Sequence, residues 1–190
     1  INKSEKISGC LVGEPTNVNQ VGDTIKIGRR GSFTGSLIVK GIQGHVGYPD
    51  LAENPINSLL KMLEPFTKIY LDKGTSEFQP SSVMITTIDV NNDASNVIPG
   101  EAKAKFNIRF NTLHSVASLK SMLKNQFDAI TKNYEFDYFC NAEPFLTSDE
   151  ELKSTLQNAI IKVVNINPEK STTGGTTDAR FITKLCPVIE

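Results

Sequence analysis

The residues that could take part in catalysis or binding are few and widely separated. Glu14 stands before Pro15 at the end of a short apolar segment, where a carboxylate can face an active site. His45 lies between Gly44 and Gly47, and glycines allow the backbone to approach a ligand closely. Taken alone, the two residues are more typical of a solvated loop acid and a turn histidine.

A second candidate is the segment 172–180, which is dense in hydroxyls and glycine and ends in Arg180. Its backbone N–H groups, hydroxyls and guanidinium suit a carboxylate or a phosphate, although a flexible turn has the same composition. It is not a Walker loop, because the Gly-Lys-Ser/Thr core is absent. Arg29 and Arg30 between glycines, and Arg109 on the polar face of a predicted strand, are further candidates for binding carboxylates.

Several other chemistries lack support in the sequence. His45 and His114 stand in neither an HxxxH nor an HxD spacing, and a zinc site needs three or four converging ligands. We expect His114 to be a surface residue near the start of a helix. A Gly-x-Ser-x-Gly elbow is absent, so nucleophilic catalysis is not indicated. Cys10, Cys140 and Cys186 form no CxxC pair, which favours a reducing, cytoplasmic compartment over a disulfide framework.

Length and charge limit the partners of the protein. The 190 residues include 20 basic and 21 acidic side chains, and a net charge of -1 provides no field for nucleic acid or acidic membranes. The sequence has no apolar run approaching the ~20 residues of a membrane span. It begins without Met and ends in an apolar segment without a cap, so we expect a chain truncated at both ends.

The elements that must position these residues follow from hydrophobic periodicity. Alternating or β-branched runs predict strands, and apolar residues at helical spacing predict helices. Strands are expected at 9–13, 24–27 (which could also be a connector), 36–42, 83–90, 102–110 and 134–140. Helices are expected from Asn54-Pro55, over 119–130, and after a capping box at 148–151 that buries Leu152, Leu156, Ile160 and Val163.

The middle of the chain therefore runs strand, helix, strand, strand, helix, strand. This order is typical of a ferredoxin-like βαββαβ sandwich, with an antiparallel sheet and both helices on one face. The strand at 102–110 alternates strictly, so we expect its polar face to be open. We predict an α/β protein with an α+β insert: residues 28–143 form the inserted domain, and 1–27 and 144–190 are pieces of its host domain.

Taken together, the segments resemble the succinyl-diaminopimelate desuccinylase family of two-zinc amide hydrolases. The resemblance covers essentially the whole chain. It rests on Leu11-Val12-Gly13-Glu14-Pro15, Gly28-Arg29-Arg30-Gly31-Ser32, Gly41-Ile42-Gln43-Gly44-His45-Val46 with Tyr48-Pro49, Leu51-Ala52-Glu53-Asn54-Pro55, Asn96-Val97-Ile98-Pro99-Gly100-Glu101, Phe106-Asn107-Ile108-Arg109-Phe110, Pro144-Phe145-Leu146-Thr147, and Gly174-Gly175-Thr176 with Asp178 and Arg180-Phe181.

The resemblance implies the hydrolysis of N-succinyl-LL-2,6-diaminopimelate to succinate and LL-2,6-diaminopimelate, a step in lysine and cell-wall precursor synthesis. It also implies a zinc-peptidase-like catalytic domain, of which the flanking pieces are parts, with two bound metal ions, zinc or cobalt. An inserted ferredoxin-like lid would form a homodimer. Glu14 resembles a zinc ligand. His45 resembles the lid histidine that reaches the partner subunit's site and stabilises the oxyanion there.

The remaining roles implied by the resemblance concern a substrate with several carboxylates. Tyr48 and Asn96 resemble lid residues that reach the partner's substrate. The groups that would hold the substrate carboxylates are Arg29, Arg109, Thr176, Arg180 and the backbone N–H of Gly175, each by its resemblance to the corresponding family residue.

The sequence departs from the family pattern in ways that affect its expected activity. The other zinc ligands and the catalytic Glu are absent, so we expect these 190 residues alone to be inactive. Asn141-Ala142 replaces a usual Ser-Gly, and Asp50 stands where relatives often have His. Two alternatives stay open: a related deacylase such as acetylornithine deacetylase, and a non-catalytic dimerisation module, since an open sheet edge seeks a partner.

Overall fold

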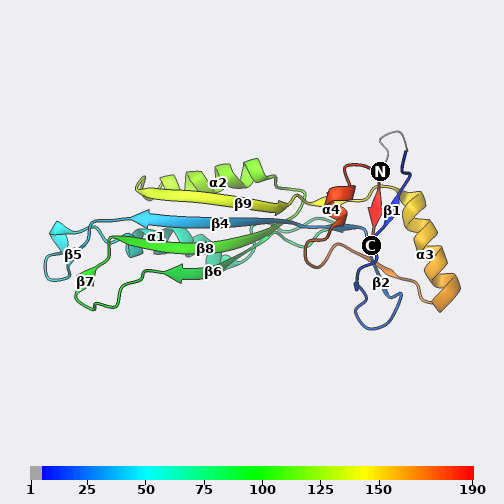
Figure 1. The fold of residues 1–190 in the computed structure, drawn as a ribbon, viewed down its shortest axis with the longest axis horizontal. Helices are drawn as coiled ribbons and strands as arrows, with labels where there is room; N and C mark the ends of the chain where they lie inside the picture. The colour runs from blue at the N-terminus through cyan, green and yellow to red at the C-terminus, as the bar shows by residue number, and fades with distance from the viewer. Residues whose placement is uncertain (1–5) are drawn as a thin grey trace.

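The molecule is elongated, with a four-stranded sheet and two helices at one end and a smaller group of short strands at the other (Figure 1). The structure is a computed structural model that describes residues 6–190. Residues 1–5 of the predicted flanking piece 1–27 lie outside the described residues. No helix within 6–190 combines the length and the apolar character of a membrane span.

The large sheet contains β4 (Gly31–Lys40), β6 (Ser82–Asp89), β8 (Glu101–Phe110) and β9 (Tyr134–Ala142). Its order is β6-β8-β4-β9, and every neighbouring pair is antiparallel. The helix α1 (Pro55–Leu63) connects β4 to β6, and α2 (Val116–Asp128) connects β8 to β9. The predicted order of strands and helices in the middle of the chain is therefore confirmed.

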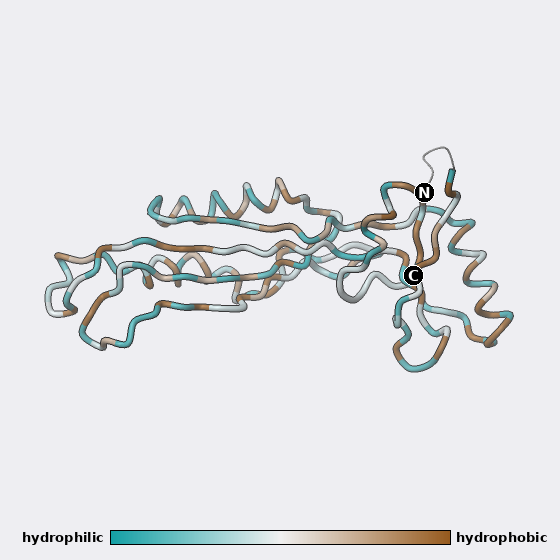
Figure 2. Tube along the Cα trace, viewed as in Figure 1, coloured by the Kyte–Doolittle hydropathy of each residue, from teal (hydrophilic) through white to brown (hydrophobic). Residues whose placement is uncertain are grey.

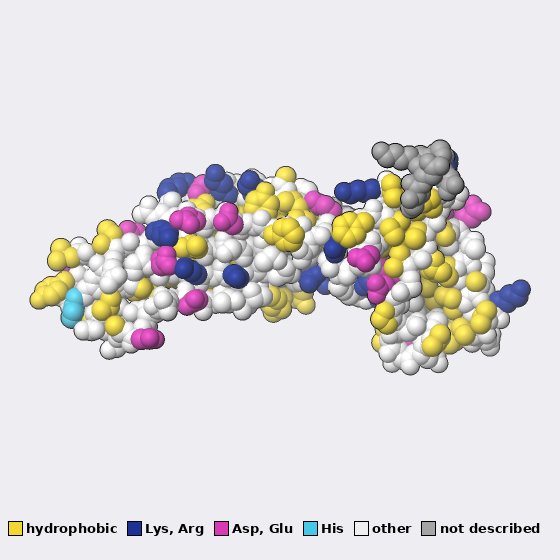
Figure 3. All heavy atoms as spheres, in the orientation of Figure 1, with side chains coloured by type: hydrophobic (Ala, Val, Ile, Leu, Met, Phe, Trp, Pro, Cys, Tyr) yellow, Lys and Arg dark blue, Asp and Glu magenta, His cyan; other side chains and the backbone are white. Residues whose placement is uncertain are grey.

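One face of this sheet is apolar and is covered by both helices. Phe106 and Ile108 of β8 are fully buried, together with Leu59 of α1 and Leu123 of α2, in one hydrophobic cluster. The opposite face is open to solvent, and Lys103 and its polar neighbours on β8 alternate with the buried residues. Figure 3 shows basic and acidic side chains interspersed over the visible surface of the sheet. The expected open polar face of this strand is thus confirmed.

The strand β4 begins earlier than the sequence predicts, at Gly31 rather than near Ser36. Glycine is normally depleted in strands, which is why the segment reads as a break. A Cβ on Gly31 would lie 2.5 Å from the Phe110 ring, and one on Gly35 would lie 2.3 Å from the Phe106 ring. The two glycines therefore make room for large core rings on the neighbouring strand.

The first helix begins as predicted, because the Asn54 side chain accepts a hydrogen bond from the backbone N–H of Ile56 at 3.0 Å. It ends at Leu63, and a 3-10 turn, η2 (Glu64–Lys68), follows at Pro65. The capping box lies elsewhere than predicted. It opens α2, where Ser115 and Ser118 bond each other's backbone.

The smaller unit joins short strands from both ends of the chain. Parallel pairs link β1 (Cys10–Leu11) with β12 (Val188–Ile189), and β2 (Thr24–Lys26) with β11 (Glu169–Ser171). An antiparallel pair links β3 (Gly28–Arg29) with β10 (Phe145–Leu146). The segment at 24–27 is therefore a paired strand of this unit and not a connector.

The helix α3 (Glu150–Val164) covers these strands, and hydrophobic and hydrophilic stretches alternate along it (Figure 2). Leu152, Leu156 and Ile160 pack on the small core of Ile25, Ile27 and Ile189. Two predictions for this helix were wrong. Asp149, not Ser148, caps it by accepting from the Leu152 N–H at 2.8 Å, and Val163 is 81% exposed because its side chain lies off the packed stripe.

Candidate functional site

A hollow of about 340 Å³ lies in the smaller unit, where the parallel strands end. Its lining comes from three stretches: 14–16 after β1, Lys26 and Arg29 at the ends of β2 and β3, and 173–177 after β11. Because carboxyl ends of parallel strands meet at one edge, the fold gathers these residues there. Four residues that the sequence singled out are thereby brought together: Glu14, Arg29, Gly175 and Thr176.

Arg29 is nearly buried and already has an anionic partner. Its Nε donates to Glu190 Oε2 at 2.9 Å, its Nη2 donates to the same oxygen, and its Nη1 donates to the Thr173 carbonyl at 2.6 Å. The positive charge of Arg29 is therefore compensated within the chain. Sequence reasoning missed Glu190, which lies 161 positions away along the chain.

Gly174 lies against this guanidinium. Its φ is +111°, and a Cβ at this position would stand 2.1 Å from Arg29 Nη1. Glycine is needed here both for the backbone conformation and for the close contact. The neighbouring Gly175 is different, because a Cβ there would meet nothing within 4 Å.

Lys26 is a lining residue that sequence reasoning missed. It is only 5% exposed, and its Nζ donates to Ser171 Oγ at 3.1 Å and to Thr173 Oγ1 at 2.7 Å. Burial, together with the nearby charge of Arg29, lowers the pKa of Lys26. The alternation of the segment 24–27 concealed this residue, since a lysine in such a pattern normally marks a solvent face.

A second group of predicted residues lies at the opposite end of the molecule (Figure 1). The strand β5 (Gly44–His45) pairs with β7 (Val97–Ile98), and the Val46 N–H donates to the Asn96 carbonyl at 3.0 Å. The rings of His45 and Tyr48 have centroids 5.8 Å apart. We call this group of His45, Tyr48 and Asn96 the distal tip.

At the distal tip, the Gly47 N–H donates to His45 Nδ1 at 2.9 Å. A neutral imidazole that accepts at Nδ1 carries its proton on Nε2, so the Nε2–H is a donor. Both His45 and Tyr48 are exposed. Within one chain, however, this donor lies at the other end of the sheet from the hollow (Figure 1).

Two predicted arginines belong to neither group. Arg109 is half-buried near the end of β8, opposite Ser32 and Ser82, and its charge contributes to lowering the pKa of Arg30, although burial of Arg30 is the larger cause. The guanidinium of Arg180, in α4 (Ala179–Ile182), lies 4.5 Å from the centre of the Phe181 ring. Its Nε is buried and has no partner among the described residues.

His114 is not the surface residue that we expected. Its Nε2 lies 3.1 Å from Asp72 Oδ2, and its side chain is mostly buried. Asn111 Nδ2 and the Gly74 N–H donate to Asp72 Oδ1 at 3.0 Å and 2.6 Å. Although burial opposes it, these hydrogen bonds and those from Ser81 lower the pKa of Asp72 to about 2. His114 therefore belongs to a structural network.

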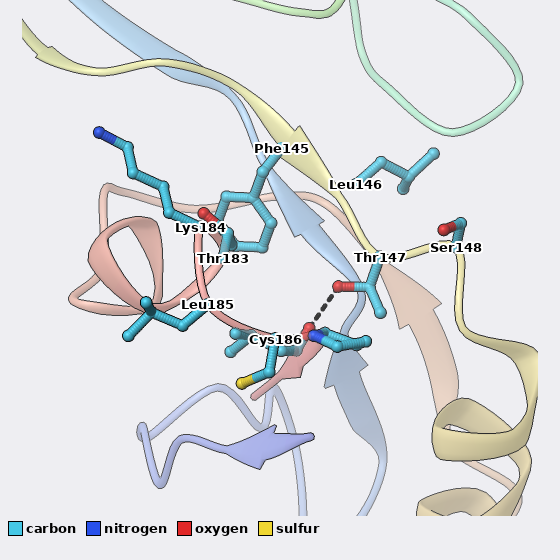
Figure 4. A pocket seen from close by; sticks show the side chains of 10 residues that line it. Phe145, Leu146, Thr147, Ser148, Thr183, Lys184, Leu185 and Cys186 are labelled. Atoms are coloured by element: carbon cyan, nitrogen blue, oxygen red, sulfur yellow. Dashed lines mark hydrogen bonds between the residues drawn. The ribbon is translucent and has the colours of Figure 1, made fainter. Parts of the chain in front are cut away.

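A larger hollow of about 540 Å³ lies beside β10, between residues 145–148 and 183–188 (Figure 4). The Thr147 hydroxyl donates to the Val188 carbonyl, so it is engaged in holding the two segments together. Burial raises the pKa of Cys186, which disfavours a thiolate. In Figure 4 the Lys184 side chain extends away from Thr147. This hollow lacks an acid–base pair and is not our candidate site.

The described residues do not fit a complete metal centre. Across residues 6–190, no group of three or more His, Cys, Asp and Glu side chains is placed to hold a metal ion. Glu14 is exposed on the hollow and is the one residue to which the family resemblance assigns a zinc. These residues alone therefore do not build the predicted zinc site.

Comparison with known proteins decides the family. A family model described as a peptidase dimerisation domain, M20_dimer, matches residues 27–135. The chain belongs to the M20 dimerisation family. The matched range contains β4, α1, β6, β8 and α2 of the large sheet and ends within the first residues of β9.

The chain is also a homologue of succinyl-diaminopimelate desuccinylase. It is 50% identical to the enzyme of that name from Pelagibacter ubique over 192 residues, covering 99% of this chain and 50% of the relative. The corresponding enzyme from Ehrlichia chaffeensis is 45% identical and is also half covered. The chain thus spans about half the length of the curated relatives that it matches.

Solved structures support the fold of this M20 family member. The aminopeptidase PepT from Bacillus cereus matches 88% of this chain with a TM-score of 0.70 and 15% identity, over 44% of its own chain. A tripeptidase from Staphylococcus aureus matches the same share with a TM-score of 0.69 and 16% identity. At such identities the likeness concerns the mixed α/β fold alone.

Proposed function

We propose that this chain is the substrate-binding and dimerisation portion of a succinyl-diaminopimelate desuccinylase. The complete enzyme would hydrolyse N-succinyl-LL-2,6-diaminopimelate to succinate and LL-2,6-diaminopimelate in the cytoplasm. The observation that carries the proposal is the hollow itself. It combines Glu14, the cationic residues Lys26 and Arg29, and the hydroxyl-rich loop 173–177. The chain that forms it is 50% identical in sequence to a relative of that name.

The chemistry of the hollow suits an acyl group that carries a carboxylate. The backbone N–H groups of Gly175 and Thr176 and the hydroxyl of Thr176 are neutral donors, and cations nearby strengthen their attraction for an anion. Arg109 and Arg180 remain proposed contacts for other substrate carboxylates, because they lie outside this hollow's lining. Glu14 would be the contribution of this chain to the zinc centre, and we derive no step through that metal.

The distal tip would act on the neighbouring subunit. His45 presents its Nε2–H to solvent at the end of the sheet farthest from its own hollow (Figure 1). A neutral donor of this kind could stabilise the oxyanion that forms when the succinyl carbonyl is attacked. Tyr48 and Asn96 lie beside it and would contact the same substrate. This arrangement requires a dimer.

We propose that the dimer forms along β6 and α1. The sheet has two edges, β6 and β9, and an edge strand presents unpaired backbone groups. Large apolar side chains are exposed along β6 and on the adjacent helix, namely Met84 at 52%, Ile88 at 51% and Leu60 at 54%. On the other edge Phe139 of β9 is 66% exposed, but the neighbouring helix α2 exposes Lys120 and Lys124. Burial of the apolar set favours the β6 edge.

In this scheme residues 28–143 form the ferredoxin-like lid, and 1–27 and 144–190 are parts of a zinc-peptidase-like catalytic domain. The two hydrophobic clusters support the division, since the large sheet and the smaller unit each have their own core. The two chain segments that join the units run through the antiparallel pair of β3 and β10, at the edge of the smaller unit. Relative motion of the units would then change the distance between lid and hollow.

The proposal is tested by the substrate preference of the full gene product loaded with zinc. We expect kcat/KM to be at least about tenfold higher for N-succinyl-LL-2,6-diaminopimelate than for N-acetylornithine, because a tenfold ratio needs only about 1.4 kcal/mol of transition-state discrimination. A preference for the acetyl substrate would instead favour a deacetylase. Absence of turnover with both, in a protein that still dimerises, would favour a non-catalytic module.

A further inference from the structure

A second hollow, of about 440 Å³, lies at the outer edge of the large sheet, between α2 and the edge strand β9. Its lining consists of Lys120, Lys124, Asp128, Lys132, Tyr134 and Phe136. Figure 3 shows basic side chains along the upper rim of this unit, where Figure 1 places α2 above β9. With three lysines against one aspartate, the lining carries a net charge of +2.

The carboxylate of this lining is already engaged. Asp128 Oδ2 lies 3.0 Å from Lys132 Nζ, and Asp128 Oδ1 accepts a hydrogen bond from the Tyr134 hydroxyl at 2.8 Å. The bond from Tyr134, followed by that from Lys132, lowers the pKa of Asp128, and the charge of Lys124 contributes. No ion pair formed among residues 6–190 involves Lys120 or Lys124. The hollow therefore attracts further negative charge.

The strand β9 adds an unpaired backbone to this hollow. Among the described strands it pairs with β4 alone, and an edge strand presents N–H and C=O groups without partners. Tyr138 and Phe139 of β9 are 39% and 66% exposed, so the edge also offers aromatic rings. Lys120 Nζ lies 5.1 Å from the centre of the Tyr138 ring, which places the lysines of α2 beside this edge.

The spacing of the lysines on α2 matches that of an added strand. Lys120 and Lys124 are four residues apart on one helix, which corresponds to about 6 Å along its axis. Side chains on one face of a strand recur at every second residue, or about 6.6 Å. Phe127 packs against Phe136 and Lys120 lies over Tyr138, so helix and strand run side by side in opposite directions. An extended chain paired with β9 would meet both lysines with successive side chains of one face.

The charges around β9 indicate which chain would fit. Glu135 and Asp137 are exposed and alternate with the residues that face α2, so they lie on the opposite face of the strand. Acidic side chains of an added strand are therefore favoured on the α2 side only. A second copy of this chain is disfavoured, because pairing two β9 edges would bring two rows of lysines together.

We infer that the edge of β9, with Lys120 and Lys124 of α2, is a docking surface for an extended acidic segment of a partner protein. The segment adds a strand to the sheet through backbone hydrogen bonds and directs alternate carboxylates toward the two lysines. Phe139, on the other face of β9, contacts apolar side chains of the same segment. This surface lies apart from the candidate site and from the proposed dimer edge at β6, so binding here is independent of turnover.

The test titrates the full gene product with a fluorescent peptide in which glutamates alternate with threonines. We expect Lys120→Glu combined with Lys124→Glu to weaken binding by about tenfold or more, since it replaces charge attraction by repulsion. The control combines Lys73→Glu with Lys105→Glu, two exposed lysines of the same unit that do not line the hollow, and should bind like the unaltered protein. Thermal melting checks each fold, and glutamine replaces glutamate in any variant that does not melt cooperatively.

A second peptide separates strand addition from charge attraction alone. N-methylation of every residue keeps the carboxylates but removes the backbone N–H donors, so this peptide should bind at least about tenfold more weakly. Hydrogen exchange followed by mass spectrometry should show that the unmethylated peptide protects residues 134–142. Equal affinity of the two peptides, or no binding of either, would overturn the inference. Tighter binding of an oligonucleotide of equal charge would also overturn it, as would conversion of a dimer to a monomer by the two glutamate substitutions, which would assign this edge to a second copy.

Discussion

The carboxylate of Glu190 holds the guanidinium of Arg29 in a contact that is almost completely shielded from solvent. The side chain of Arg29 is 10% exposed and that of Glu190 is 1% exposed. Glu190 Oε1 has no hydrogen-bond partner among the described residues, so Arg29 is the one side chain of the described part of the protein that donates hydrogen bonds to this buried carboxylate. The pair joins β3 to the residue that follows β12 and thereby fixes one wall of the candidate site.

Removing one partner of this pair should be strongly destabilising. We expect Arg29→Gln to lower the free energy of unfolding by about 3–5 kcal/mol, because it leaves the Glu190 charge buried and unpaired. Urea unfolding measures the change. The matched control is Lys40→Met, which breaks a solvent-exposed pair with Glu101 and should have a much smaller effect, because solvent screens this pair. Equal effects of the two variants would refute the importance of burial.

The adjacent glycines 174 and 175 should differ sharply in their tolerance of a methyl group. Gly174→Ala should destabilise the protein by about 1–3 kcal/mol, since alanine disfavours φ of +111° and its Cβ would collide with Arg29. Gly175→Ala should change the unfolding free energy by less than about 1 kcal/mol, because its Cβ position is open. Thermal or urea unfolding of both variants tests this contrast. A Gly174→Ala variant as stable as the unaltered protein would show that this loop does not hold residue 174 at positive φ against Arg29.

Interference with the proposed dimer edge should yield monomers. Ile88→Glu places a charge in the apolar set on β6, and burial of an unpaired charge is costly. Light scattering across a concentration series should show a dimer for the unaltered protein and a monomer for this variant. Phe139→Glu, on the opposite edge strand β9, is the control and should stay dimeric. The reverse pattern would move the interface to β9.

The proposed role of His45 across a dimer predicts complementation between two inactive variants. Under the proposed function, Glu14→Ala would disable a subunit's own site, whereas His45→Ala would disable the partner's site. Random pairing of the two variants should restore about a quarter of the unaltered activity, because half of the dimers are mixed and each mixed dimer has one intact site. Succinate release from the mixture measures this. No recovery after subunit exchange would place His45 outside the neighbouring site.

The Asp72 network predicts acid sensitivity of the unit that contains the large sheet. The hydrogen bonds from Ser81, Gly74 and Asn111 lower the pKa of Asp72 from 3.8 to about 2, despite the opposing effect of burial. A depressed carboxyl pKa stabilises the fold above the unfolded pKa, and this stabilisation is lost as pH falls from about 4 through about 2. Asp72→Asn should therefore cost about 2 kcal/mol at pH 6 and almost nothing near pH 2. Urea unfolding at both pH values checks this, with the exposed Asp137→Asn as the control.

Much of the large sheet and its helices could be predicted from the sequence, for a local physical reason. The strict alternation at 102–110 and the Asn54-Pro55 helix start are encoded in neighbouring residues, and both are observed. The start of β4 was missed because glycine is normally a poor strand residue. Only the large rings of Phe106 and Phe110, which come from another strand, explain why Gly31 and Gly35 are needed there.

The sequence by itself determined the order of strands and helices around the large sheet and the residue types available for chemistry. Tertiary structure decided which of these residues meet. Arg29 and Glu190 are 161 positions apart, and only the pairing of short strands from both ends of the chain brings them together. The same pairing buries Lys26, whose alternating pattern suggests a solvent face. Burial and counter-ions are properties of contacts between distant segments, so no local pattern could have revealed that Arg29 pairs with Glu190 or that Lys26 is buried.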